Sequence, residues 1–447
     1  MAMASYSVLL ITAFFLFPIA FAATSGIFPA FKSIYQFGNS LSDTGNLLRW
    51  GTMFYPADKL PYGETYFRKA TGRFSDGRLI VDFIAAAANL PYLDAYLNKN
   101  GSFAHGVNFA VAGATANERE FFDKRNISYD EFKPAILEQL EWFEKYINST
   151  CRKDCAEKFG NSLFIFGEYG GNDYFPAFQQ GKSISEVMSY VPHTVAAIIH
   201  GVKRVIQHGA KRILVPGPYP FGCLPSQLTS SGTDKADDYD QFGCLKKYND
   251  FAAYHNRFLQ VALSKLNRQY ASKGVVIVYG DFYGGFMNIF HNANELGFNH
   301  ESGSLVKACC GGGGAYNFDK AKPCGKEGSS VCTNPKAAVH WDGVHLTDAS
   351  HRHISQFVIN QFTFEIVLHA QIDFAHIDFV YDMMAPRGSG YYLIPRNTSL
   401  TDQTDLLRKP TGRISDGRLI VDFIAAALKT PVLDAYLNAN GSFAHWR

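Results

Sequence analysis

The sequence has no long run of lysine and arginine, and its 447 residues carry a formal net charge of only +2. We therefore expect no nucleic-acid partner and no binding to an anionic membrane surface. Beyond the N-terminal segment, no stretch reaches 18 consecutive apolar residues, so the mature chain is expected to have no membrane span. Charged residues make up 18% and hydrophobic residues 47%. This composition is typical of a packed globular protein with one large domain or two to three smaller ones.

Three short motifs are also missing. No C-x-x-C pair occurs, which argues against a zinc site. No G-x-S-x-G motif occurs, so the nucleophile turn of an α/β-hydrolase is absent. The glycine run Gly311–Gly314 lacks the G-K-[ST] of a phosphate-binding loop. We expect neither a metal nor another cofactor.

The N-terminus has the pattern of a secretory signal peptide. Val8–Phe21 is an apolar core, and Ala20-Phe21-Ala22 matches the small-x-small cleavage pattern. We therefore predict a signal peptide over residues 1–22 and a secreted protein, extracellular or vacuolar, with an uncleaved membrane anchor as the alternative. Five candidate glycosylation sites agree with secretion: Asn100, Asn126, Asn148, Asn397 and Asn440.

The eight cysteines all lie between Cys151 and Cys332. An even number in an oxidising compartment predicts disulfides. Cys151 and Cys155 are placed to close a small loop. The other six are Cys223 and Cys244, which bracket a polar loop, and Cys309, Cys310, Cys324 and Cys332 in a glycine-rich loop. The sequence leaves the pairing open.

Short apolar runs alternate with helical patterns along the chain. Strands are expected at 33–37, 162–166, 212–216 and 275–279, with a further short one near 90–93. Helices are expected at 76–88, 131–146, 185–208, 238–270 and 347–368. Continuous apolar strands between helices predict an α/β fold with a mainly parallel sheet covered on both faces. Ligands of such folds bind at the carboxyl ends of the strands, where Ser40 and the loop after Phe166 are expected.

The C-terminal part repeats an earlier segment. Residues 411–445 match residues 71–105 at 29 of 35 positions, and "SLTDQTDLL" from Ser399 is a weaker copy of "SLSDTGNLL" from Ser40. The copy lacks most strands of a sheet. We therefore assign residues 23–368 to one domain and residues 369–447 to an extension, which is either a remnant of duplication or gene fusion, or a regulatory tail.

Four blocks contain residues suited to catalysis. Ser40 follows a strand in "FGNSLSDTGN", although a serine there can also cap a helix. Asp342 precedes His345 by three residues, a spacing that lets the carboxylate fix the imidazole tautomer. Gly113 lies among small residues that let a backbone N–H approach a ligand, or that simply pack tightly. Asn172 follows a strand and two glycines, where its amide can stabilise an oxyanion or form a turn.

As a set, these blocks resemble the plant branch of the GDSL esterase/lipase family, the SGNH hydrolases, and specifically its acetylajmalan-esterase-like members. The resemblance covers about residues 33–368 and implies a flavodoxin-like three-layer α/β/α sandwich. It implies Ser40, Asp342 and His345 as catalytic residues, and Ser40, Gly113 and Asn172 as the oxyanion hole. The family's motif has aspartate where this chain has Asn39, a change expected to alter the hydrogen bonding of the turn without abolishing activity.

The implied function is a serine esterase that acts, as a monomer, on carboxylic esters of small acylated metabolites or lipids. Two alternatives remain open at this stage. An acyltransferase would use the same acyl-enzyme, and an ester-binding homologue would be catalytically weak.

Overall fold

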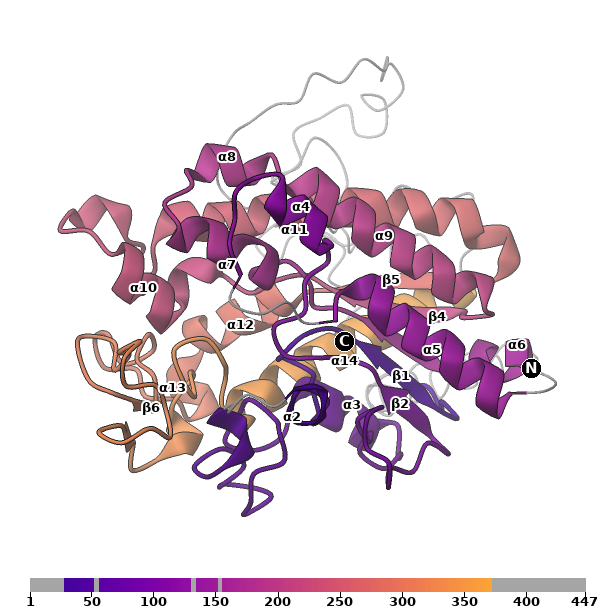
Figure 1. Cartoon of the computed structure of the whole chain (residues 1–447), viewed down its shortest axis with the longest axis horizontal. Helices are drawn as coiled ribbons and strands as arrows, with labels where there is room; N and C mark the ends of the chain where they lie inside the picture. Colours follow the sequence, from indigo (N-terminus) through magenta and orange to yellow (C-terminus); the bar gives the residue numbers. More distant parts are fainter. Residues whose placement is uncertain (1–27, 52–55, 130–133, 152–154, 372–447) are drawn as a thin grey trace, which may run out of the picture. The chain divides into compact units, whose positions relative to one another are not determined.

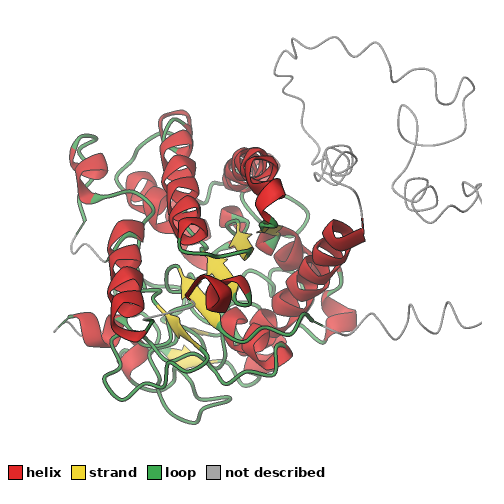
Figure 2. Cartoon of the chain, turned by 90° about the vertical axis from the view of Figure 1, so that its right-hand side faces the viewer, coloured by secondary structure: helices red, strands yellow, loops and turns green. Residues whose placement is uncertain are grey.

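A parallel sheet lies at the centre of the computed structural model, which describes residues 28–51, 56–129, 134–151 and 155–371. The strands lie in the order β2–β1–β3–β4–β5, the order of a flavodoxin-like fold. Their bounds are β1 Ile34–Phe37, β2 Gly106–Asn108, β3 Leu163–Phe166, β4 Arg212–Pro216 and β5 Val276–Gly280. Helices cover both faces, as Figure 1 and Figure 2 show. The structure confirms the predicted α/β fold with a parallel sheet.

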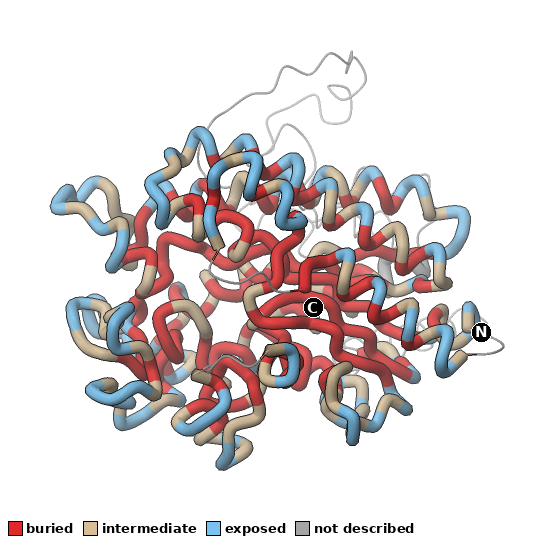
Figure 3. Tube along the Cα trace, in the orientation of Figure 1, coloured by how far each residue is buried: buried red, intermediate tan, exposed pale blue. Residues whose placement is uncertain are grey.

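A different set of helices covers each face of the sheet. On one face, alternate strand residues such as Tyr35 and Phe37 pack against Phe143 of α5 (Ile136–Thr150). Helices α9 (Val191–Gln207) and α11 (Lys246–Tyr270) extend this layer. On the other face, Gln36 and Ile165 point toward α3 (Ile80–Ala87) and α12 (Phe282–His291), and α14 (Asp348–Gln371) packs on α12. Nearly all strand residues are buried (Figure 3) because both faces are covered.

Shorter elements lie in the connections. They are helices α2 Leu47–Trp50, α4 Arg119–Asp123, α6 Cys155–Gly160, α7 Gly171–Gln179, α8 Ile184–Met188, α10 Pro225–Ser231 and α13 Ala293–Leu296, and strands β6 Cys310–Gly311 and β7 Ser330–Val331. Among the described residues, no helix combines the length and the apolar character that crossing a membrane requires.

The strand predicted near residues 90–93 is wrong. The second strand is β2, which is only three residues long and for which the sequence analysis predicts no strand. Gly106 opens β2 at φ +115°, where a Cβ atom would lie 1.8 Å from the carbonyl oxygen of Ile34. Close backbone pairing therefore defines this strand, and its side chains carry little signal.

Several helix predictions needed new boundaries. The helix predicted over 131–146 is α5, which begins at Ile136 and ends at Thr150. Helix α3 begins at Ile80 rather than at Asp76, whose carboxylate instead accepts a hydrogen bond from the N–H of Asp348 at 2.7 Å. The helix predicted over 185–208 is two helices, α8 and α9, and Pro192 lies in the first turn of the second. The helix predicted from residue 238 begins at Lys246, because the residues before it belong to a disulfide loop.

Four disulfides join all eight cysteines: Cys151–Cys155, Cys223–Cys244, Cys309–Cys332 and Cys310–Cys324. The last two cross-link the glycine-rich loop. In that loop, the N–H groups of Cys309 and Cys310 donate to the carbonyls of His340 and Trp341, at 2.9 and 2.7 Å. The cross-linked loop therefore supports the backbone directly before Asp342.

Several predictions concern the chain outside the sheet. Asn100, Asn126 and Asn148 are exposed, as glycosylation would require. The predicted signal peptide, Asn397, Asn440 and the repeat at 411–445 lie outside the described residues. Within the described ranges, no group of three His, Cys, Asp or Glu side chains is arranged to hold a metal ion.

A buried ion pair holds the segment before α3. Two nitrogens of Arg73 donate to the two carboxylate oxygens of Asp82, each at 2.8 Å. Asp82 also accepts the N–H of Leu79 at 2.9 Å, at the start of α3. Because the side chains are 7% and 0% exposed, neither charge has access to water as an alternative partner.

Asp82→Asn is expected to lower the free energy of unfolding by about 3–5 kcal/mol, because the charge of Arg73 would remain buried without a partner. Urea unfolding measures the loss. Glu120→Gln, which removes an exposed ion pair with Lys124, is the control and should leave the midpoint unchanged. An Asp82→Asn midpoint equal to that of the wild type would contradict a structural role for the buried pair.

Candidate active site

Ser40 lies in a tight turn at the carboxyl end of β1. Gly38 precedes it at φ +150°, and a Cβ atom there would come within 2.6 Å of the carbonyl oxygen of Gly167, so the turn needs glycine at this position. The carbonyl of Asn39 accepts the N–H groups of Ser42 and Asp43, at 3.1 and 3.0 Å, and closes the turn. Ser40 remains half-buried at the edge of the sheet.

Asp43 ties this turn to the segment that leads to Gly113. Its buried carboxylate accepts backbone N–H groups of Gly45, Asn46 and Leu47 from its own loop, at 2.7, 2.6 and 3.0 Å. It also accepts the N–H of Ala112 at 2.9 Å. Burial raises the pKa of Asp43, and the four backbone N–H groups oppose that rise.

Asp342 and His345 meet Ser40 from the loop before α14. Nδ1 of His345 lies 2.8 and 3.0 Å from the two oxygens of Asp342, and Nε2 lies 2.8 Å from Oγ of Ser40. Although burial by itself raises the pKa of Asp342, the charge of His345 and the hydrogen bonds to the carboxylate hold it well below its usual range. An ionised Asp342 accepts a hydrogen bond from Nδ1–H of His345. Nε2 then carries no proton and can accept a hydrogen bond from the Ser40 hydroxyl.

Two aromatic residues that sequence reasoning missed lie against Asp342 and His345. The hydroxyl of Tyr62 donates to Asp342 at 2.7 Å, and the ring of Phe74 lies 4.8 Å from that of His345. Burial, followed by the charge of Asp342, raises the pKa of Tyr62, so the hydroxyl stays protonated as a donor. Neither residue belongs to a motif, and only the fold brings them to the loop of Asp342.

Gly113 and Asn172 lie on neighbouring segments. Gly113 has φ +86°, and the side chain of Asn172, in the first turn of α7, donates to the carbonyl of Ala114 at 2.9 Å. The buried Asp173 joins the two segments because it accepts the N–H groups of Ala116 and Asn117, each at 2.9 Å. Burial raises the pKa of Asp173 to about 6, against the effect of these donors.

The backbone N–H groups around Ser40 fall into two kinds. Several are occupied: Leu41 donates to the side chain of Asn39, Ala112 to Asp43 and Ala114 to the carbonyl of Val111. By contrast, the N–H groups of Ser40 and Gly113 donate to no acceptor among the residues that the structure describes. This pattern is typical of an oxyanion-binding site.

Asn39 contacts a buried acid that sequence reasoning also missed. Its side-chain amide donates to Oε2 of Glu168 at 2.9 Å, and its oxygen accepts the N–H of Leu41 at 3.0 Å. Glu168 follows β3 and precedes α7, so the contact joins the Ser40 turn to the loop of Asn172. Burial raises the pKa of Glu168 to about 7.

Comparison with known proteins identifies the family of this chain. Residues 34–358 match the GDSL-like Lipase/Acylhydrolase family. Acetylajmalan esterase from Rauvolfia serpentina is 43% identical over 341 residues, which cover 75% of this chain and 87% of that esterase. Sinapine esterase from Brassica napus is 40% identical over 368 residues, which cover 80% of this chain and 93% of that esterase. The chain therefore belongs to the GDSL esterase/lipase family and is a carboxylic ester hydrolase.

Proposed function

We propose that Ser40, His345 and Asp342 form the catalytic triad of this hydrolase and that the reaction proceeds through an acyl-enzyme. The observation that carries the proposal is the continuous contact from Asp342 through both ring nitrogens of His345 to Oγ of Ser40. A serine hydroxyl becomes a nucleophile when an oriented base takes its proton, and this contact supplies such a base.

The steps follow from the positions of the groups. Nε2 of His345 takes the Ser40 proton while Oγ attacks the ester carbonyl, and Asp342 stabilises the imidazolium that forms. The oxyanion accepts hydrogen bonds from the backbone N–H groups of Ser40 and Gly113 and from the side-chain amide of Asn172. This amide has two N–H groups, and only one of them is bonded to the carbonyl of Ala114. His345 then protonates the leaving alcohol, and an activated water molecule releases the acid.

For the natural substrate, we favour esters of small acylated metabolites over lipid esters. The support comes from two relatives whose names give acetylajmalan and sinapine as substrates. That both are named esterases also favours hydrolysis over acyl transfer. Product analysis with and without an acceptor alcohol separates these two reactions, and p-nitrophenyl esters of short and long acyl chains separate the substrate classes.

The same proposal includes secretion after removal of residues 1–22. Four disulfides are typical of proteins that fold in an oxidising compartment. The exposed positions of Asn100, Asn126 and Asn148 are compatible with glycosylation there. We further propose that residues 23–368 form the hydrolase domain, since the family match ends at residue 358.

Ser40→Ala should abolish hydrolysis of p-nitrophenyl acetate, with a loss of at least about 10³-fold in kcat, because no other group in the triad can form the acyl-enzyme. Steady-state kinetics measure the loss. Ser399→Ala changes the serine of the weaker repeat and should leave the rate unchanged. Undiminished activity of Ser40→Ala would refute the triad.

Asn172→Ala should reduce kcat by roughly 10²–10³-fold with little change in KM, because the amide acts on charge that develops only in the transition state. Asn161→Ala, which changes an exposed asparagine directly after α6, is the matched control. If kcat falls no more in Asn172→Ala than in the control, the amide does not belong to the oxyanion hole.

A chain that ends after Gln371, the last residue of α14, should keep kcat within about twofold of the full-length protein, because the proposed domain and the site are complete in it. Kinetics and thermal unfolding of both forms test this. A shortened chain that folds but has lost its activity would show that the extension contributes to catalysis.

A further inference from the structure

Glu168 lies where two parts of the proposed machinery meet. It belongs to the loop between β3 and α7, four residues before Asn172 in sequence, and its side chain reaches back to the Ser40 turn. Oε2 accepts the amide of Asn39 at 2.9 Å, and Oε1 accepts the N–H of Gly171 at 3.3 Å. One carboxylate therefore joins the residue before Ser40 to the residue before Asn172.

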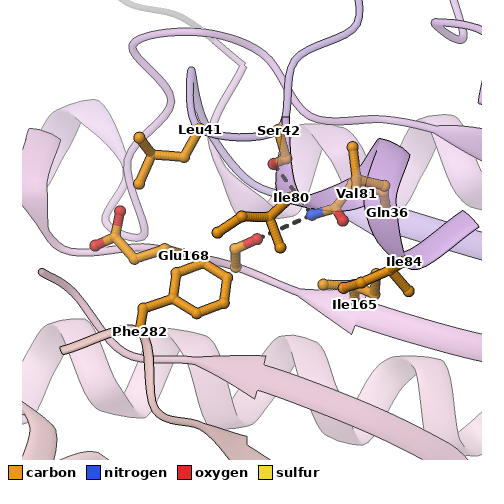
Figure 4. A pocket seen from close by; sticks show the side chains of 10 residues that line it. Gln36, Leu41, Ser42, Ile80, Val81, Ile84, Ile165, Glu168 and Phe282 are labelled. Carbon is orange, nitrogen blue, oxygen red and sulfur yellow. Dashed lines mark hydrogen bonds between the residues drawn. The ribbon is translucent and has the colours of Figure 1, made fainter. Parts of the chain in front are cut away.

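The surroundings of Glu168 provide little compensation for its charge. Glu168 is 3% exposed and lines a small cavity together with apolar residues such as Ile80, Ile84 and Phe282. Figure 4 shows Glu168 on the side of this cavity where Leu41 and Phe282 also lie. An acid retained in such a place, with no cation among its described contacts, needs a reason beyond packing.

The titratable groups around Glu168 are acids and phenols. Asp173 faces it from α7, and its negative charge raises the pKa of Glu168 further. The hydroxyls of Tyr169, Tyr174 and Tyr219, from its own loop, from α7 and from the segment after β4, also interact with its charge, and burial keeps all three protonated. Within the described residues, the hydrogen bonds to this carboxylate come from the Asn39 amide and the Gly171 N–H.

The ionised form of Glu168 fits these partners better than the neutral form. Both contacts are N–H donors, and a carboxylate accepts both. A protonated Glu168 would turn an O–H toward one of the two N–H groups and lose that contact. The amide of Asn39 cannot titrate, so the pair keeps its hydrogen bond at any pH above the pKa of Glu168.

We propose that Glu168 is a positioning residue for the Ser40 reaction: through Asn39 and Gly171 it fixes the nucleophile turn relative to the start of the helix that carries Asn172. This inference rests on the proposed function. Loss of either contact would shift the nucleophile relative to the oxyanion donor, and such a shift reduces kcat more than it changes KM.

Three variants separate this role from simple packing. In Glu168→Gln, the new side chain can accept from Asn39 or from Gly171 but not from both, so one contact is lost. In Asn39→Asp, two carboxyl groups lie in contact and share one proton. In the double variant N39D/E168Q, the new amide at position 168 donates to the new carboxylate at position 39, while the amide oxygen accepts the N–H of Gly171. Every hydrogen bond of the wild type then has a counterpart.

The sign of the pH dependence differs between the single variants. Asn39→Asp keeps its contacts while the pair holds its shared proton and loses them when the pH rises and both groups ionise, so its kcat relative to the wild type falls with rising pH. For Glu168→Gln, the deficit is smallest below the wild-type pKa of about 7, where Glu168 is itself protonated, and grows above it.

The experiment measures kcat and KM for p-nitrophenyl acetate from about pH 6 to about pH 9, with thermal unfolding of each variant. We expect Glu168→Gln to lose on the order of tenfold in kcat at high pH, Asn39→Asp to lose a similar amount only at high pH, and the double variant to recover the wild-type kcat. Glu365→Gln, which alters a buried glutamate of α14, is the matched control and should keep the wild-type kcat and KM.

Equal kcat for wild type and Glu168→Gln at every pH, or a double variant no better than Glu168→Gln, would overturn the inference. If Glu168→Gln does not fold, the pH profile of Asn39→Asp and the rescue by the double variant still decide. Ser40→Ala in the same assay separates the two proposals: if it stays active, the proposed function fails, whereas an inactive Ser40→Ala with no effect at Glu168 removes the positioning role alone.

Discussion

The geometry around Ser40 depends on buried carboxylates that occupy the backbone N–H groups of its neighbours. Asp43 joins the nucleophile turn to the Gly113 segment, and Asp173 joins that segment to α7. Glu168 joins α7 back to the turn. Together these contacts connect the three segments in a closed set. Within the described residues they leave the N–H groups of Ser40 and Gly113 without an acceptor, which is what an oxyanion site requires.

The buried carboxyl groups of this site have pKa values shifted in opposite directions. Asp43, Asp173 and Glu168 are surrounded by neutral donors, and burial raises the pKa of each. Asp342 is also buried, but the neighbouring His345 and several donors hold its pKa low. The charge that supports the imidazolium is thereby kept where the proposed reaction needs it, and the other acids serve as anchors.

Local sequence is enough to indicate the proposed triad because its members lie in short motifs. The runs at Ser40, Gly113, Asn172 and Asp342–His345 each read as a turn, and their combination indicated the site. The sequence also predicts the strands that have apolar runs. It does not predict β2, because backbone pairing with β1 defines its three residues. Tyr62 and Phe74 carried no signal, since their partners lie far along the chain.

Glu168 could have been noticed, because it is an acid in a glycine-rich segment between the buried strand β3 and Asn172. The pairing of Cys309 and Cys310 was beyond sequence reasoning, because adjacent cysteines can exchange partners without changing any spacing.

In the proposed mechanism, Ser40 is the residue that becomes acylated. Labelling the active protein with a fluorophosphonate, which traps activated serine hydroxyls, followed by mass spectrometry of its peptides, tests this most directly. If Ser40 is the acylated residue, one adduct per chain is expected, on Ser40, formed in parallel with the loss of esterase activity. An adduct on another residue that accompanies the loss of activity, or full esterase activity in a chain labelled at Ser40, would contradict it.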